Sequence, residues 1–118
     1  MNELFNCVMG VNLNGQFFAC RTAIKVLNKQ ETGGTIVNVA SIASYLGARG
    51  GAAYTMSKHA AIGLTKNIAS FYGRENGKIR ANVIAPGSIA NTVLFLASDE
   101  SKFINGEVVT VDGAWTTR

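Results

Sequence analysis

The sequence has few of the features that mark secreted proteins. It contains one proline and two cysteines in 118 residues, which excludes a proline-rich linker and a dense disulfide framework. On one helix, Cys7 and Cys20 would be separated by roughly 20 Å of rise, whereas a disulfide needs Cα atoms about 5.5 Å apart. We therefore expect two reduced thiols. Neither cysteine has Cys-x-x-Cys or Cys/His spacing, so no metal site is predicted.

Long apolar runs and clustered positive charge are also absent. No run approaches the roughly 20 apolar residues of a membrane span. The first ten residues, MNELFNCVMG, lack the basic start and apolar run of a secretory signal. The formal net charge is +4, but the basic residues are scattered and do not alternate with aromatic residues. We predict a cytoplasmic protein with neither a nucleic acid nor a membrane as its partner.

The remaining pattern is that of one α/β domain. The chain is 47% hydrophobic and 15% charged, which is typical of a globular domain. Long helical patterns alternate with short β-branched runs, an order that predicts right-handed crossovers and a parallel sheet. The expected helices are 2–29, 52–73 and 90–98, and the expected strands are 35–41, 79–86 and 107–113.

Ligands of open parallel sheets bind beyond the carboxyl ends of the strands. Three features of this sequence fall at such ends: Ser41, the Pro86–Gly87 turn and the pair Asp112–Gly113. The first two also belong to the chemical pattern described next.

Tyr54 and Lys58 stand four residues apart in the segment AAYTMSKHAA, residues 52–61. This spacing on a helix places both side chains on one face, with Cβ atoms roughly 5–6 Å apart. An ammonium beside a phenol favours the phenolate, which suits proton transfer in catalysis. A bare Tyr-x-x-x-Lys pattern is nevertheless more often a surface lysine beside a half-buried tyrosine.

The surrounding segments favour the chemical interpretation. Ser41 precedes Tyr54 by thirteen residues, Asn12 lies within VNLNG, and RANVIAPGSI places a proline-glycine turn after a strand. These elements, in this order, closely resemble the short-chain dehydrogenase/reductase family. The resemblance covers nearly the whole chain, including TIVNVASIAS, AAYTMSKHAAIGLTK and NTVLFLASDESKFINGEVVTVDG.

The resemblance implies a role for each of four catalytic residues. Tyr54 would be the general acid/base that exchanges a proton with the substrate oxygen. Lys58 would stabilise the phenolate and hydrogen-bond the nicotinamide ribose. Ser41 would hydrogen-bond the substrate oxygen, and Asn12 would hold a water in line with Lys58.

The resemblance also implies ligands and partners. Pro86, Gly87 and Ile89 would line the nicotinamide of NAD or NADP, in addition to the contacts of Tyr54 and Lys58. The substrate would be a small alcohol or carbonyl compound, contacted by Ser41 and Tyr54, with Ser44 as a further contact. The family commonly forms homodimers or homotetramers, so we expect such an assembly here.

Two segments of the family pattern are missing. None of the thirteen glycines forms a Gly-x-Gly pair, and the family's Asn-Asn-Ala-Gly segment is absent. The substrate lid between the proline-glycine turn and FLASDES is also absent, and Asn91 stands at the position of a pyrophosphate-binding threonine. We therefore expect residues 1–118 to form a single incomplete domain, a partial Rossmann-like doubly wound sheet that represents the catalytic and C-terminal part of the family fold.

Two functions follow from this pattern. The first is an NAD(P)-dependent oxidoreductase that interconverts an alcohol and a ketone or aldehyde, although we expect weak or no activity from the 118 residues alone. The alternative is a truncated, non-catalytic interaction module that pairs with full-length family members.

Overall fold

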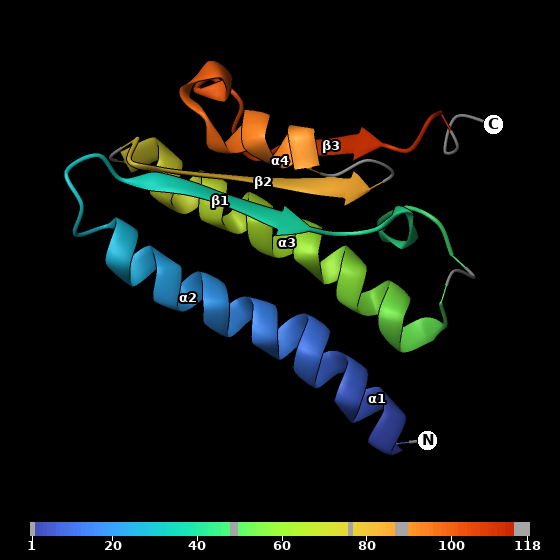
Figure 1. Cartoon of the computed structure of the whole chain (residues 1–118). Coiled ribbons are helices and arrows are strands. Elements are labelled where there is room, and N and C mark those ends of the chain that lie inside the picture. The colour runs from blue at the N-terminus through green and yellow to red at the C-terminus, as the bar shows by residue number, and fades with distance from the viewer. Residues whose placement is uncertain (1, 48–49, 76, 87–89, 115–118) are drawn as a thin grey trace.

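The computed structural model describes residues 2–47, 50–75, 77–86 and 90–114, which form a sheet with helices on both faces (Figure 1). Strands β1, β2 and β3 comprise Gly34–Val39, Ile79–Pro86 and Val108–Val111. All are parallel in the order β1-β2-β3, with Gly34 opposite Ile79 and Val83 opposite Val108. This confirms the predicted α/β fold with a parallel sheet.

The central strand β2 is buried along most of its length because it has a neighbour on each side and helices on both faces. Ile79, Ala81 and Val83 are fully buried. Ile79 and Ala81 form one core cluster with Cys20 and Ile68, so this cluster joins β2 to helices on one face of the sheet. Both faces of β2 are therefore covered, and the polar side chains within it, Arg80 and Asn82, are hydrogen-bonded inside the protein.

The helices form two layers around the sheet. Helix α2, Gln16–Leu27, and helix α3, Ala52–Glu75, run side by side on one face (Figure 1). Helix α4, Ala90–Ala97, covers the other face. Helix α1, Asn2–Met9, continues into α2 through a π-helical turn, η1, Gly10–Gly15.

The π-helical turn differs from the single regular helix predicted for residues 2–29. A π-helical turn adds one residue to the turn, and it shifts every later side chain around the axis. Apolar periodicity over six residues cannot distinguish this turn from a regular one. The turn contains Asn12, one of the predicted catalytic residues.

Two buried asparagines link the elements through side-chain hydrogen bonds. Asn38 accepts from the Cys20 thiol at 3.4 Å and donates to the Thr65 hydroxyl at 2.9 Å. Asn82 donates to the carbonyl of Ile104 at 3.0 Å and accepts from the backbone N–H of Glu107 at 3.0 Å. Because buried polar groups are costly without partners, these asparagines fix helices and strands in one register.

Three further boundaries differ from the sequence-based predictions. Strand β1 ends at Val39, two residues before the end of the predicted strand 35–41, and a 3₁₀ turn, η2, Ile42–Ser44, follows it. Strand β3 is shorter than the predicted 107–113 because Gly113 has φ 61° and Asp112 bonds the N–H of Ala114, which turns the chain. A second 3₁₀ turn, η3, Asp99–Ser101, follows α4.

Candidate functional site

Tyr54 and Lys58 lie in the first two turns of α3, beside the carboxyl end of β1. The Lys58 ammonium nitrogen is 5.6 Å from the centroid of the Tyr54 ring, so the two side chains share one helix face as predicted. The same nitrogen donates to the carbonyl oxygen of Val39, the last residue of β1, at 3.4 Å. Lys58 therefore lies between the tyrosine ring and the strand end.

A glycine supports the Tyr54 ring from the preceding loop. Gly50 has φ 84°, a conformation that favours glycine, and a Cβ added there would lie 2.7 Å from Cδ1 of Tyr54. A larger residue at position 50 would thus press against the ring. The sequence analysis did not identify this role, although the Gly50–Gly51 pair directly before α3 is a signal for such a close approach.

Ser41 lies two residues beyond the end of β1 and caps the 3₁₀ turn η2. Its Oγ accepts the backbone N–H of Ala43 at 3.2 Å, and its own backbone is extended. The hydroxyl proton of Ser41 has no acceptor among the residues that the structure describes. A hydroxyl held as an acceptor in this way retains one donor for an external oxygen.

Ser44 connects the Ser41 turn to α3. Its hydroxyl donates to the carbonyl oxygen of Lys58 at 2.8 Å and accepts the backbone N–H of Ser41 at 3.3 Å. The residue is only 3% exposed. The substrate contact predicted for Ser44 stays a prediction, and in this structure its single proton is donated within the protein.

Asn12 reaches α3 from the π-helical turn. Its side-chain amide donates to the Ser57 hydroxyl at 3.2 Å, and that hydroxyl donates to the backbone carbonyl of Tyr54 at 2.7 Å. Ser57 is fully buried. The structure therefore brings Asn12 to the Tyr54–Lys58 segment, while its role in holding a water stays a prediction. Ser57, inside the Tyr-x-x-x-Lys pattern, was missed because its neighbours alone gave it no distinguishing signal.

The predicted cofactor residues after β2 are described only in part. Pro86 ends β2, is partly buried and pairs with Val111 of β3. Gly87 and Ile89 lie outside the described residues. The nicotinamide contact predicted for these two residues therefore stays a prediction.

Tyr45 links the turn after β1 to β3. Its hydroxyl lies 3.1 Å from the Thr110 hydroxyl, although the tyrosine is 42% exposed. Thr110 pairs with Ala85 of the central strand, so the contact joins two segments on either side of β2. The sequence could not have paired these residues, which are 65 positions apart.

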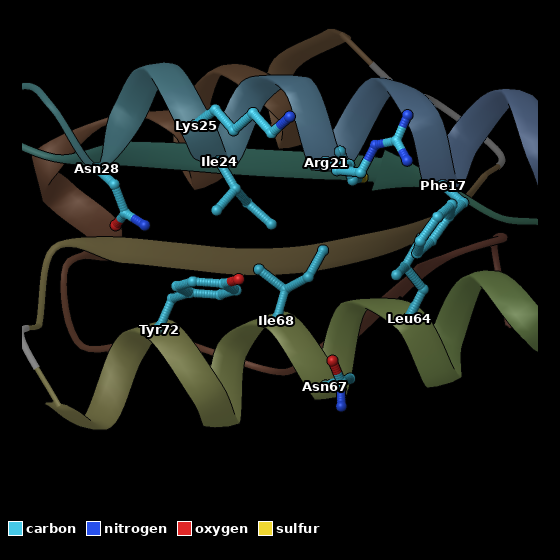
Figure 2. A pocket seen from close by; sticks show the side chains of 10 residues that line it. Phe17, Arg21, Ile24, Lys25, Asn28, Leu64, Asn67, Ile68 and Tyr72 are labelled. Atoms are coloured by element: carbon cyan, nitrogen blue, oxygen red, sulfur yellow. The ribbon is translucent and has the colours of Figure 1, made fainter.

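A hollow of about 310 Å³ lies between α2 and α3, away from Tyr54 and Lys58 (Figure 2). Ile24 and Ile68 face each other across it, with Tyr72 at one end and Phe17 at the other. Arg21 packs over the Phe17 and Phe18 rings at 5.9 and 5.0 Å. Most of the lining surface is apolar, although Arg21, Lys25 and Tyr72 also contribute to it.

Other candidate sites are few in the described part of the chain. His59 is exposed, and its Nδ1 lies 2.9 Å from the carbonyl of Thr55 in the previous turn. The described residues contain no group of three histidine, cysteine or acidic side chains placed to hold a metal ion. Among the described helices, none combines the length and apolar character needed to span a membrane.

Comparisons with known proteins identify the family of this chain. A family profile described as short chain dehydrogenase matches residues 1–102. The 3beta-hydroxysteroid dehydrogenase 2 of Eggerthella lenta is 34% identical over 98% of this chain and 57% of its own length. The 2-(R)-hydroxypropyl-CoM dehydrogenase of Xanthobacter autotrophicus is 33% identical over 97% of this chain and 58% of its own length.

A solved structure gives the same result. The 4-hydroxyisoleucine dehydrogenase complexed with NADH and succinate has a TM-score of 0.89 and 35% identity, covering all of this chain and 62% of that one. The chain therefore belongs to the short-chain dehydrogenase/reductase family.

The chain spans well under two thirds of the length of these two curated relatives. Their alignments extend over 150 and 147 positions, more than the 118 residues of this chain, so both relatives carry residues that have no counterpart here.

Proposed function

We propose that this chain provides the proton-transfer part of an NAD(P)-dependent oxidoreductase that interconverts an alcohol and a ketone or aldehyde. The observation that carries the proposal is the position of the Lys58 ammonium between the Tyr54 ring and the carboxyl end of β1. Ser41 lies two residues beyond that strand end, with a hydroxyl proton to donate. Open parallel sheets bind their ligands at this edge.

The residues of this chain would act on the substrate oxygen. In the oxidation direction, the Tyr54 phenolate would accept the hydroxyl proton as the carbonyl forms, and in reduction the phenol would return it. Ser41 would donate a hydrogen bond to the same oxygen and hold it toward Tyr54. The positive charge of Lys58 would stabilise the phenolate form of Tyr54. A bound nicotinamide supplies the hydride acceptor or donor.

The residues present fit the nicotinamide end of NAD or NADP. An ammonium group has three donors, and the described contact of Lys58 with Val39 uses one of them at 3.4 Å. The others remain for ribose hydroxyls, and Pro86 ends the neighbouring strand at the same edge of the sheet. The sequence contains no Gly-x-Gly turn for the pyrophosphate, so the fit is to this end alone.

The proposal is tested by binding and turnover together. Titration of the 118-residue chain with NADH and NADPH, followed by nicotinamide fluorescence, measures the cofactor affinity. Turnover of a panel of secondary alcohols and ketones is followed by absorbance of the reduced cofactor. Binding with turnover supports an enzyme, whereas a folded chain that binds neither cofactor supports the non-catalytic interaction module.

We also propose that the chain forms homodimers or homotetramers in a reducing compartment such as the cytoplasm. The apolar hollow between α2 and α3 (Figure 2) offers a surface for a second copy, and Phe103, beyond α4, is 91% exposed. Both cysteines are free thiols in the structure. Sedimentation velocity across a concentration series tests the assembly, and a monomer at all concentrations would contradict it.

A further inference from the structure

We propose that Ser44 is a positioning residue that holds the substrate-binding and cofactor-binding segments of the site in register. The inference rests on the proposed function, because it concerns the same Ser41, Tyr54 and Lys58. It replaces the substrate contact that the sequence suggested for Ser44.

The hydroxyl of Ser44 joins two separate segments. Ser44 Oγ donates to the carbonyl of Lys58 in α3 at 2.8 Å and accepts the N–H of Ser41 at 3.3 Å. These residues lie fourteen and three positions from Ser44 in the chain. The hydroxyl therefore connects the backbone of the proposed substrate-binding serine with the backbone of the proposed cofactor-binding lysine.

The connection that Ser44 makes is shielded from water. Ser44 is 3% exposed and Ala43 beside it is fully buried, so solvent cannot replace a lost hydrogen bond easily. The turn is also fixed by its own backbone, since the N–H groups of Tyr45 and Leu46 both donate to the carbonyl of Ile42. Ser44 thus attaches a rigid turn to a helix.

Among the described residues, no other side chain links the Ser41 turn to α3 by hydrogen bonds in this way. The Lys58 ammonium contacts Val39, and the Ser41 hydroxyl bonds within its own turn to Ala43. Without the Ser44 hydroxyl, the segment that carries Ser41 and the segment that carries Lys58 would keep only packing contacts and the exposed lysine contact. A small displacement of reacting groups is costly in catalysis.

The test compares Ser44→Ala with Ser101→Ala. Ser101 is also buried and also donates to a backbone carbonyl, that of Leu96 at 3.0 Å, but it lies beyond α4 in η3. Both variants lose a buried hydroxyl and should lower the unfolding midpoint. Only Ser44→Ala should change the site when each variant is studied well below its own unfolding temperature.

Two readouts separate positioning from general stability. The first needs no cofactor: NMR resonances of the Tyr54 ring carbon Cζ and the Lys58 side-chain nitrogen should move in Ser44→Ala and stay unchanged in Ser101→Ala. The second readout is the NADH affinity, together with kcat and KM determined separately for each variant. Ser44→Ala should weaken NADH binding and lower kcat, each by about three- to tenfold, the loss expected for one buried hydrogen bond.

The outcomes are distinct. Shifted resonances with no NADH binding by the unaltered chain would support the positioning role and reject the proposed function. Unchanged resonances and unchanged NADH affinity in Ser44→Ala would overturn the positioning role. A rise in substrate KM alone, with the resonances and NADH affinity unchanged, would return Ser44 to a direct substrate contact and also overturn the inference.

Discussion

Replacement of Arg80 should be among the most destabilising substitutions in this domain. Arg80 is the second residue of β2, and its guanidinium connects the start of the sheet with the segment after α4. Nη1 donates to the carbonyls of Ser101 and Ile104 at 2.9 and 3.2 Å. Nη2 donates to the carbonyl of Ser98 at 3.0 Å and to the Thr35 hydroxyl at 3.1 Å.

The magnitude follows from these contacts. A hydrogen bond to a charged group contributes about 1.5–3 kcal/mol, so these four contacts summed independently would rival the whole stability of a typical domain. The contacts share two nitrogen atoms and the partly buried charge loses hydration, so they cannot be additive. We expect Arg80→Met to cost about 3–5 kcal/mol, because several carbonyl oxygens lose their donor at about 1–3 kcal/mol for each one left unsatisfied.

Arg80→Lys provides the matched control. Lysine keeps the charge but lacks the planar fork that reaches several carbonyls at once, so we expect a smaller loss of about 2 kcal/mol. Urea unfolding followed by circular dichroism measures the free energy of unfolding from the midpoint and the slope. A loss below about 1 kcal/mol for Arg80→Met would refute the claim that Arg80 stabilises the domain by bonding β2 to the segment after α4.

Two further substitutions test the local geometry. Gly50→Ala should cost about 1–3 kcal/mol and displace the Tyr54 ring, whereas Gly47→Ala, where a Cβ meets no atom within 4 Å, should be nearly neutral in urea unfolding. Burial raises the pKa of the Cys20 thiol, so the folded chain keeps that proton where the unfolded chain loses it. The free energy of unfolding should therefore fall as the pH rises above the ordinary thiol pKa, and Cys20→Ala should remove this fall. Iodoacetamide should modify the exposed Cys7 before the buried Cys20. Equal labelling rates of the two thiols in the folded chain, or the same alkaline loss in Cys20→Ala, would contradict the buried environment of Cys20.

The sequence predicted the sheet better than the turns. The strand 79–86 was located correctly because a largely apolar run, containing only Arg80 and Asn82 as polar residues, ends at the one proline. The helix starting at residue 52 was also located correctly, since the Gly50–Gly51 pair precedes it. Such local signals do not depend on the rest of the fold.

The π-helical turn and the 3₁₀ turn could not be predicted in the same way. The turn at Gly10–Gly15 differs from a regular helix by a single inserted residue, and apolar spacing does not resolve that difference. The turn at Ile42–Ser44 carries a capping pattern, with serines three residues apart, that the sequence analysis passed over. Its significance appears only when the Ser44 hydroxyl is seen to bond Lys58.

The sequence indicated that Tyr54 and Lys58 lie together near the end of β1, but it did not indicate the residues that support them. Tyr54, Lys58 and Ser41 were recognisable because residue type, spacing and flanking segments agreed. Ser57 bonds Asn12, which is 45 positions away in the chain, and Tyr45 contacts Thr110, which is 65 positions away. No local pattern in the sequence indicates either pairing. Tertiary packing, and not propensity, decides these contacts.

The most direct test of the central claim is the turnover of Tyr54→Phe beside its NADH affinity. The substitution removes the phenol oxygen and keeps the ring that lies beside Lys58. We expect NADH affinity to change by less than about twofold and turnover to fall by about 10²–10⁴-fold, the contribution of a general acid/base. Turnover by Tyr54→Phe at the rate of the unaltered chain would contradict the assignment of Tyr54 as the residue that transfers the proton.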